Sequence, residues 1–217
     1  MRLGCHQVQE DEDLLRLLLI RHGETDWNAE GRIQGQSDVP LNPRGHQQAE
    51  RLAHYLAEEP VTAIYASDLL RASETARYVA QALSMPAAYD QRLREVHFGE
   101  WQGMTFEEVL QHDPEAAARW SADPIQCRPP GGETLAELAA RVADCLEEIR
   151  THHDGTVLVV THGGSIRVAL CAFLAYPLRQ NWRFEVHNTS VSELVWRDRG
   201  PVVVRWNDTA HLRSNGS

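Results

Sequence analysis

The hydrophobic positions of this chain fall into two kinds of stretch that alternate along its length. Short, largely uninterrupted apolar runs are typical of strands buried on both faces, and they occupy residues 17–20, 61–66 and 156–160. Longer amphipathic stretches repeat an apolar residue every three or four positions, and they cover residues 49–56, 69–83, 135–149 and 166–173. Strands that alternate with helices predict an α/β fold, a three-layer α/β/α sandwich with a mostly parallel central sheet.

Two segments near the C-terminus alternate between apolar and polar residues, SELVW at 192–196 and PVVVRW at 201–206. This pattern predicts antiparallel strands at one edge of the sheet. Residues 97–132 combine short helical pieces with a link rich in proline and glycine. We therefore expect a helical lid within a single domain that spans residues 14–207.

The balance of charge argues against two classes of partner, nucleic acids and anionic membranes. The chain has 21 basic and 31 acidic residues and a net charge of −10, so a broad basic face for nucleic acid or anionic membranes is not expected.

No stretch approaches the about 18 apolar residues of a membrane span. The four cysteines are scattered without a C-x-x-C pair, as in a protein with reduced thiols. We expect a cytoplasmic protein, a monomer or a homodimer, with flexible tails at residues 1–13 and 208–217.

Two of the buried runs end in the same way, with a histidine followed by a glycine. His22 follows the first run and His162 follows the run at 156–160. Ligands of open α/β sheets bind at the carboxyl ends of the strands, so neighbouring parallel strands would bring both imidazoles to one edge. Arg21 and Arg71 also lie where a predicted strand meets a helix. Two arginines and two histidines at such an edge are typical of a site for a phosphoryl group.

His22 could act as a base, a nucleophile or a metal ligand. Every basic residue of the chain is an arginine, and the absence of lysine excludes Schiff-base chemistry and the lysine of a P-loop. The sequence also shows no metal-ligand spacing, so we expect no metal. Together with the matching end of the strand at His162, these features favour a nucleophilic role for His22.

Four segments, in order, resemble the signatures of the histidine phosphatase superfamily, also called the phosphoglycerate mutase-like family. They are RHGET with Asn28 beyond it, SDLLRASETA around Arg71, LREVHFGEWQG around Glu95 and VVTHGGSIR around His162. The resemblance implies that His22 is the nucleophile and becomes a phosphohistidine. It also implies that Glu95 protonates the leaving oxygen and later activates water. The phosphate pocket that it implies consists of Arg21, Arg71 and His162, with Asn28, Gln34 and Gly163 beside them.

The family that the chain resembles includes two kinds of enzyme, phosphatases and mutases. Mutases of the family carry a longer, arginine-bearing insertion before the second histidine and tend to have asparagine after the second His-Gly. This chain has compact helical pieces in that interval, and Gly164 follows the second His-Gly. We therefore favour a phosphatase that needs no cofactor and acts on a small phosphorylated metabolite, such as a sugar, nucleotide-like or α-ribazole phosphate. A cofactor-dependent phosphoglycerate mutase is the alternative.

The sequence disfavours two further classes of protein. A non-catalytic phosphate-binding module is disfavoured because both histidines and Glu95 are present together. A serine hydrolase is disfavoured because the chain has no G-x-S-x-G elbow, although Ser165 follows a His-Gly-Gly segment.

Overall fold

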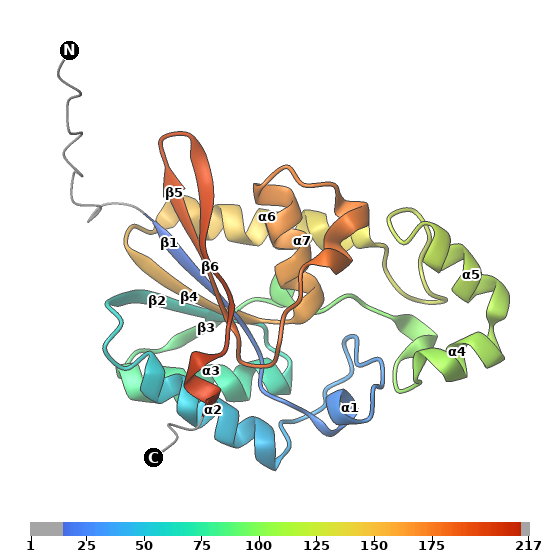
Figure 1. Cartoon of the computed structure of the whole chain (residues 1–217), viewed down its shortest axis with the longest axis horizontal. Coiled ribbons are helices and arrows are strands. Elements are labelled where there is room, and N and C mark those ends of the chain that lie inside the picture. The colour runs from blue at the N-terminus through green and yellow to red at the C-terminus, as the bar shows by residue number, and fades with distance from the viewer. Residues whose placement is uncertain (1–14, 214–217) are drawn as a thin grey trace.

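Six strands form one mixed sheet at the centre of the molecule (Figure 1). They are β1 (Arg16–Arg21), β2 (Val61–Ala66), β3 (Ala87–Tyr89), β4 (Thr156–Thr161), β5 (Val191–Arg197) and β6 (Gly200–Asp208). Their order in the sheet is β3-β2-β4-β1-β5-β6; the first four are parallel, whereas β5 and β6 are antiparallel to their neighbours. This computed structural model describes residues 15–213. The predicted parallel sheet with an antiparallel edge is confirmed.

Helices cover both faces of the sheet and complete the predicted three layers. They are α2 (Pro43–Tyr55) and α3 (Leu70–Leu83) on one face, and α6 (Leu135–His152) and α7 (Gly163–Phe173) on the other. A hydrophobic core lies on each face of the sheet, and alternate residues of β1 belong to one core or the other. Leu17 and Leu19 pack toward α6 and α7, and Leu18 and Ile20 pack toward α2 and α3. Because both faces are covered, β1 is apolar at every interior position rather than at every second one.

The starts of two helices, α2 and α6, follow from local sequence, whereas the start of α3 does not. Asn42 caps α2 with Pro43 in its first turn, and Thr134 forms a capping box with Glu137 at the start of α6. Ser67 and Asp68 stand just before α3 and are of residue types that commonly cap helices. In the structure, the strongest cap of α3 is Asp38, whose carboxylate accepts a hydrogen bond of 2.7 Å from the backbone of Leu70. Asp38 comes from a preceding loop, so helix periodicity could not identify it.

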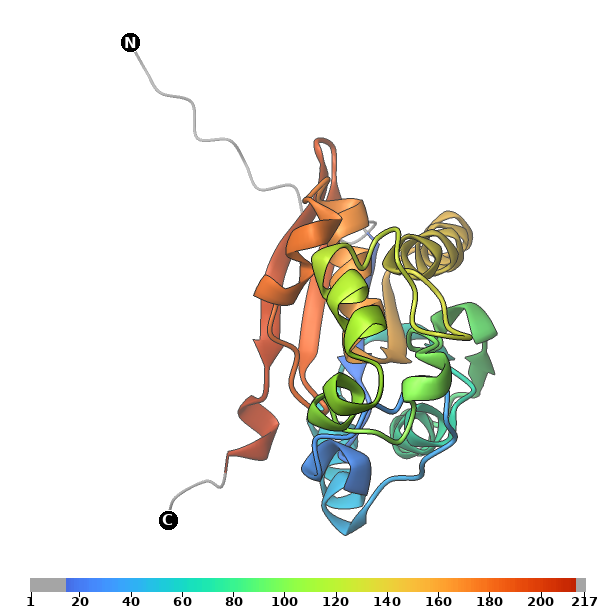
Figure 2. The same cartoon turned by 90° about the vertical axis from the view of Figure 1, so that its right-hand side faces the viewer.

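The predicted lid region consists of short helices beside the sheet. It contains η2 (Gly99–Trp101), α4 (Phe106–His112) and α5 (Pro114–Ala122), which follow η1 (Gln91–Leu93). Trp101, Val109, Ala116 and Ala117 form a small core of their own, separate from the two cores of the sheet. Figure 2 looks onto this side and shows α4 and α5 in front of the sheet. A one-turn helix, α1 (Asp26–Ala29), follows β1 on the same side (Figure 1).

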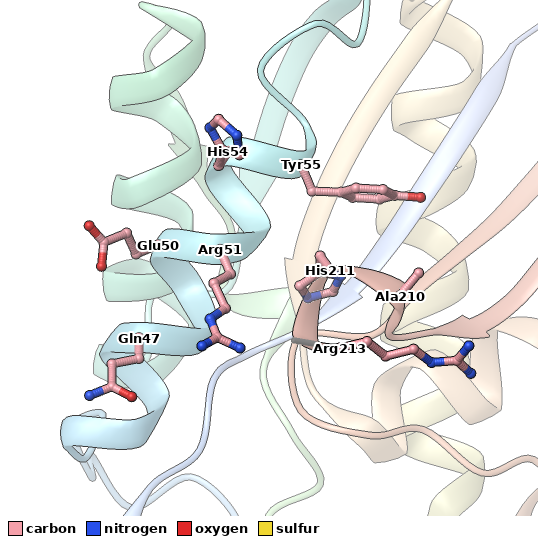
Figure 3. A pocket seen from close by; sticks show the side chains of 8 residues that line it. All are labelled: Gln47, Glu50, Arg51, His54, Tyr55, Ala210, His211 and Arg213. Atoms are coloured by element: carbon pink, nitrogen blue, oxygen red, sulfur yellow. The ribbon is translucent and has the colours of Figure 1, made fainter. Parts of the chain in front are cut away.

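Regular structure continues past Asn207, the predicted C-terminal limit of the domain. β6 extends to Asp208 and is followed by η4 (Ala210–Leu212). Arg51 of α2 donates to the carbonyl of Leu212 at 3.1 Å, and the ring of Tyr55 stacks on His211 at 5.4 Å. Figure 3 shows this region, where α2 and the C-terminal segment line an open cavity of about 720 Å³. These contacts move the limit of the domain toward Arg213; residues 1–14 and 214–217 lie outside the described chain.

Candidate active site

The pairing of β1 with β4 brings His22 and His162 together. The two strands are parallel neighbours in which Arg21 is opposite Thr161, so the next residue of each strand leaves the sheet at the same edge. The ring centroids of His22 and His162 lie 5.1 Å apart, and only 3% and 0% of these residues are exposed. The juxtaposition expected from the two strand ends is therefore present.

His22 presents one free ring nitrogen. Its Nδ1 lies 2.7 Å from the carbonyl oxygen of Gly23, which can only accept, so Nδ1 carries the proton and Nε2 has the lone pair. Burial lowers the pKa of His22 well below its usual value, and the positive charges of Arg71 and Arg21 lower it further. A neutral imidazole with a free Nε2 meets the requirement for a nitrogen nucleophile.

His162 is held by Ser67, a residue that the sequence suggests only as a helix cap. His162 Nε2 lies 2.8 Å from Ser67 Oγ, while its Nδ1 is buried without a hydrogen-bond partner among the described residues. Burial and then Arg71 lower the pKa of His162 well below its usual value. Both histidines are therefore neutral near pH 7 and available as donors or acceptors toward a ligand.

Arg21 and Arg71 give the site its positive charge. Arg71, which is 0% exposed, donates to the carbonyls of Gly35 and Ser37 at 2.7 and 2.8 Å. Arg21 donates to the carbonyl of Val186 at 2.6 Å. Burial lowers the pKa of each arginine to about 10, so both stay charged near neutral pH. The Nε atom of each is buried without a protein partner in the described chain, as expected of donors that serve an anion.

Glu95 lies against the N-terminus of α7. Its Oε2 accepts a hydrogen bond of 2.9 Å from the backbone N–H of Gly164, and its Oε1 accepts one of 2.9 Å from Val96. A β-carbon on Gly164 would lie 2.2 Å from Glu95 Oε1, which is far inside van der Waals contact. Gly164 therefore has a steric role here: it lets the carboxylate approach the helix that follows His162.

The loop that carries Glu95 is clamped by Arg141, a residue of α6 that the sequence did not single out. Its guanidinium donates to three carbonyls of that loop, those of Arg92, Arg94 and Glu95, at 2.8, 2.6 and 2.8 Å. It also forms an ion pair with Glu133. The four acceptors together fix the path of the backbone at Glu95. Because they come from a single 3-10 turn and from irregular chain, no periodic pattern could have indicated them.

Asn28, Gln34 and Gly163 occupy different positions around this centre. Asn28 Oδ1 completes the capping box of α1 with Thr25 and accepts from Asn188 at 3.3 Å. Gln34 is 8% exposed, and its Oε1 has no hydrogen-bond partner within residues 15–213. Gly163 is the first residue of α7 and lies beside the Arg21 side chain. Their contacts with phosphate remain predictions.

Asn188 is a further residue that sequence analysis missed. Its Nδ2 donates to the main-chain oxygen of His22 at 3.0 Å, as well as to Asn28. It thus joins the segment before β5 to the loop after β1. An isolated asparagine in irregular chain carries no signal of such a contact.

A cavity of about 620 Å³ opens beside Glu95 and Gly164. Its walls include three aromatic rings and two arginines, namely Phe98, Trp120, Trp182, Arg167 and Arg179. They come from the lid, from α7 and from η3 (Leu178–Arg183). Within residues 15–213, no group of three or more His, Cys, Asp or Glu side chains is arranged to hold a metal ion. No helix in that range is both long and apolar enough to span a bilayer.

The sequence model of the histidine phosphatase superfamily (branch 1) matches residues 17–209. The chain belongs to this superfamily. It is 38% identical to phosphoserine phosphatase 1 of Hydrogenobacter thermophilus over 92% of this chain and 95% of that protein. It is 36% identical to the probable phosphoglycerate mutase GpmB of Escherichia coli O1:K1, over 92% and 95% of the two chains. The solved structure of Bacillus stearothermophilus YhfR superposes with a TM-score of 0.85 at 37% identity, covering 92% of this chain and 100% of that one. The predicted family is confirmed.

Proposed function

We propose that this protein is a metal-independent phosphomonoester hydrolase that forms a phosphohistidine at His22. The observation that carries the proposal is the state of His22: a buried, neutral imidazole with a free Nε2, flanked by two charged arginines. Membership of the superfamily and similarity to a protein named a phosphoserine phosphatase support hydrolysis of a small phosphorylated metabolite.

In the first step, the lone pair of His22 Nε2 attacks phosphorus and the bond from phosphorus to the ester oxygen breaks. Arg21, Arg71 and His162 hold the phosphoryl oxygens, because positioning and charge neutralisation are the main requirements of phosphoryl transfer. Glu95 gives its proton to the departing oxygen. The imidazole becomes positively charged as Nε2 is phosphorylated, and the hydrogen bond from Nδ1 to the Gly23 carbonyl stabilises that charge.

In the second step, the Glu95 carboxylate takes a proton from a water molecule whose oxygen attacks phosphorus. The bond from phosphorus to Nε2 breaks, and its electron pair returns to a neutral His22. Inorganic phosphate leaves, and Glu95 is again protonated for the next cycle. A mutase would return the phosphoryl group to the substrate instead, and similarity to a protein named a probable phosphoglycerate mutase keeps that outcome as the alternative.

The test combines turnover with chemical trapping. The protein is incubated with 4-nitrophenyl phosphate and with 3-phosphoglycerate, while released phosphate and isomerised product are followed separately. A rapid alkaline quench in detergent after labelling should give a phosphoenzyme in the parent protein that is stable in alkali and is hydrolysed by later acid treatment. His22→Ala should give none, and its turnover should be abolished. His54→Ala, which removes an exposed histidine of α2, is the matched control and should behave like the parent.

Several results would count against the proposal. Substantial phosphatase activity in His22→Ala would refute the nucleophile assignment. Isomerisation of 3-phosphoglycerate without phosphate release would indicate the mutase. A protein that binds phosphate but turns over neither substrate would indicate a phosphate-binding module.

A further inference from the structure

The cavity beside Glu95 contains one arginine that forms no ion pair within the described part of the chain. Its charged lining residues are Glu95, Arg167 and Arg179. Arg179 already has an acidic partner, because its guanidinium lies 3.4 Å from Asp123. Arg167 forms no ion pair with any acidic residue in the described part of the chain; its Nε donates to the carbonyl of Phe184 at 2.8 Å. The terminal nitrogens of Arg167 therefore remain for a ligand.

Arg167 is also well placed relative to the reacting groups. It follows Gly164 by three positions on α7, so it lies on the same side of the helix, about 4.5 Å further along the axis. Gly164 is the residue whose backbone N–H contacts Glu95. The charge of Arg167 also contributes to the lowered pKa of Arg21, which is consistent with a position near the phosphate site.

We propose that Arg167 binds a carboxylate on the leaving group, so that the substrate is a phosphorylated hydroxy acid. The inference rests on the proposed function, since the leaving group enters this cavity only if Glu95 protonates it. A guanidinium whose Nε is already bonded offers its two terminal nitrogens as a planar fork, which matches a carboxylate. The charge of one arginine without an ion pair balances one carboxylate, whereas a second phosphate would bring close to two negative charges.

The remainder of the cavity suits the carbon part of such a substrate. Phe98, Trp120 and Trp182 provide aromatic walls, and Trp182 is 67% exposed. Apolar walls with a small number of polar anchors are the usual composition of a site for a small molecule. Arg167 would thus determine specificity, while the aromatic rings pack against the carbon part of the substrate.

The experiment compares two substrates that differ in one group. 3-Phosphoglycerate carries a carboxylate where glycerol 3-phosphate carries a hydroxymethyl group. Phosphate release should give a kcat/KM for 3-phosphoglycerate that is at least tenfold higher in the parent protein. Arg167→Gln should lower that value by about 10–100-fold, as expected for loss of a charge-assisted hydrogen bond, and should change the value for glycerol 3-phosphate by less than about threefold.

Arg197→Gln is the matched control, since it removes an exposed arginine at the end of β5 and should leave both values unchanged. Equal kcat/KM for the two substrates in the parent protein would overturn the inference without any variant, while hydrolysis of 4-nitrophenyl phosphate would still uphold the proposed function. An equal loss on both substrates in Arg167→Gln would also overturn it, because that result indicates a structural role. A protein inactive on all three esters would refute the proposed function and this inference with it.

Discussion

Replacing Arg141 with methionine tests whether the clamp on the Glu95 loop supports catalysis. The change keeps the length and apolar stem of the side chain but removes three hydrogen bonds to the carbonyls of residues 92, 94 and 95. It also leaves the Glu133 carboxylate without its charged partner. Arg141 lies far along the chain from Glu95 and belongs to a different element, so it acts on Glu95 through the position of that loop. Its charge also contributes to the lowered pKa of His162, an effect that does not depend on the leaving group.

The structure sets the size of the expected effect on stability. The side chains of Arg141 and Glu133 are only 20% and 17% exposed, so the loss is larger than for a surface pair. Removing one partner of such a pair costs about 3–5 kcal/mol, which includes the stranded carboxylate. For a chain of 217 residues, this corresponds to a fall in Tm of about 6–20 °C. Domains have about 5–15 kcal/mol of stability, so a domain in the upper part of this range still folds at 25 °C after such a loss, and the unfolding curve checks this.

The catalytic effect should depend on the leaving group. An alkyl phosphate needs a proton on its leaving oxygen, and a general acid typically contributes about 10²–10⁴-fold to such a step. A displaced Glu95 should therefore slow alkyl phosphate hydrolysis by about 10–100-fold. The rate of 4-nitrophenyl phosphate hydrolysis should change by less than about threefold, because its leaving group departs without a proton.

The assay is the ratio of alkyl to aryl kcat, measured beside a thermal unfolding curve. Arg128→Met is the control, because the exposed Arg128–Glu137 pair is worth only about 0–1 kcal/mol and does not touch the Glu95 loop. A folded Arg141→Met protein with an unchanged ratio would refute the argument that the clamp positions Glu95.

Three other predictions follow from the same site. The buried histidines His22 and His162 have lowered pKa values, so below pH 6.5 the unfolded chain takes up protons that the folded chain does not. Chemical denaturation should show a loss of about 2 kcal/mol between pH 6.5 and 5.5 from these two groups, and a flat profile would mean that both become charged in the folded protein. Gly164→Ala should slow alkyl phosphate hydrolysis by about tenfold, because its β-carbon displaces Glu95, and a fully active variant would contradict the steric role. EDTA should leave turnover intact; loss of activity that added metal restores would exclude a metal-independent enzyme.

The sequence predicted the parts of the site that sit at the ends of regular elements. His22 and His162 follow buried runs, and the rule that parallel strands end at one edge was sufficient to place them together. Glu95 could be proposed only from family resemblance, because the loop around it lacks any period. The contacts through which Arg141 holds the Glu95 loop are made to main-chain carbonyls, and no pattern of side chains in the sequence indicates them.

Other features depended on contacts between distant segments. Ser67 suits a helix cap in isolation but lies against His162 in the folded chain. Asp38 caps a helix that begins after another strand has intervened. Residues 208–213 have a polar composition typical of a tail, yet they pack on Arg51 and Tyr55 of α2. Local propensity cannot reveal such pairings, because each depends on which surfaces the sheet order makes adjacent.

The place of β1 in the sheet has a consequence for how the protein is synthesised. β1 leaves the ribosome before the other five strands of this sheet, and both of its neighbours, β4 and β5, come much later. The contact from Arg16 to Thr156 joins residues 140 apart. At about 5–20 residues per second, translation leaves β1 unpaired for roughly 7–28 s. During that time the nascent chain exposes an apolar strand with two open edges, a template for aggregation. A chain cut short before residue 156 would therefore present this strand without either neighbour and would have no phosphate site.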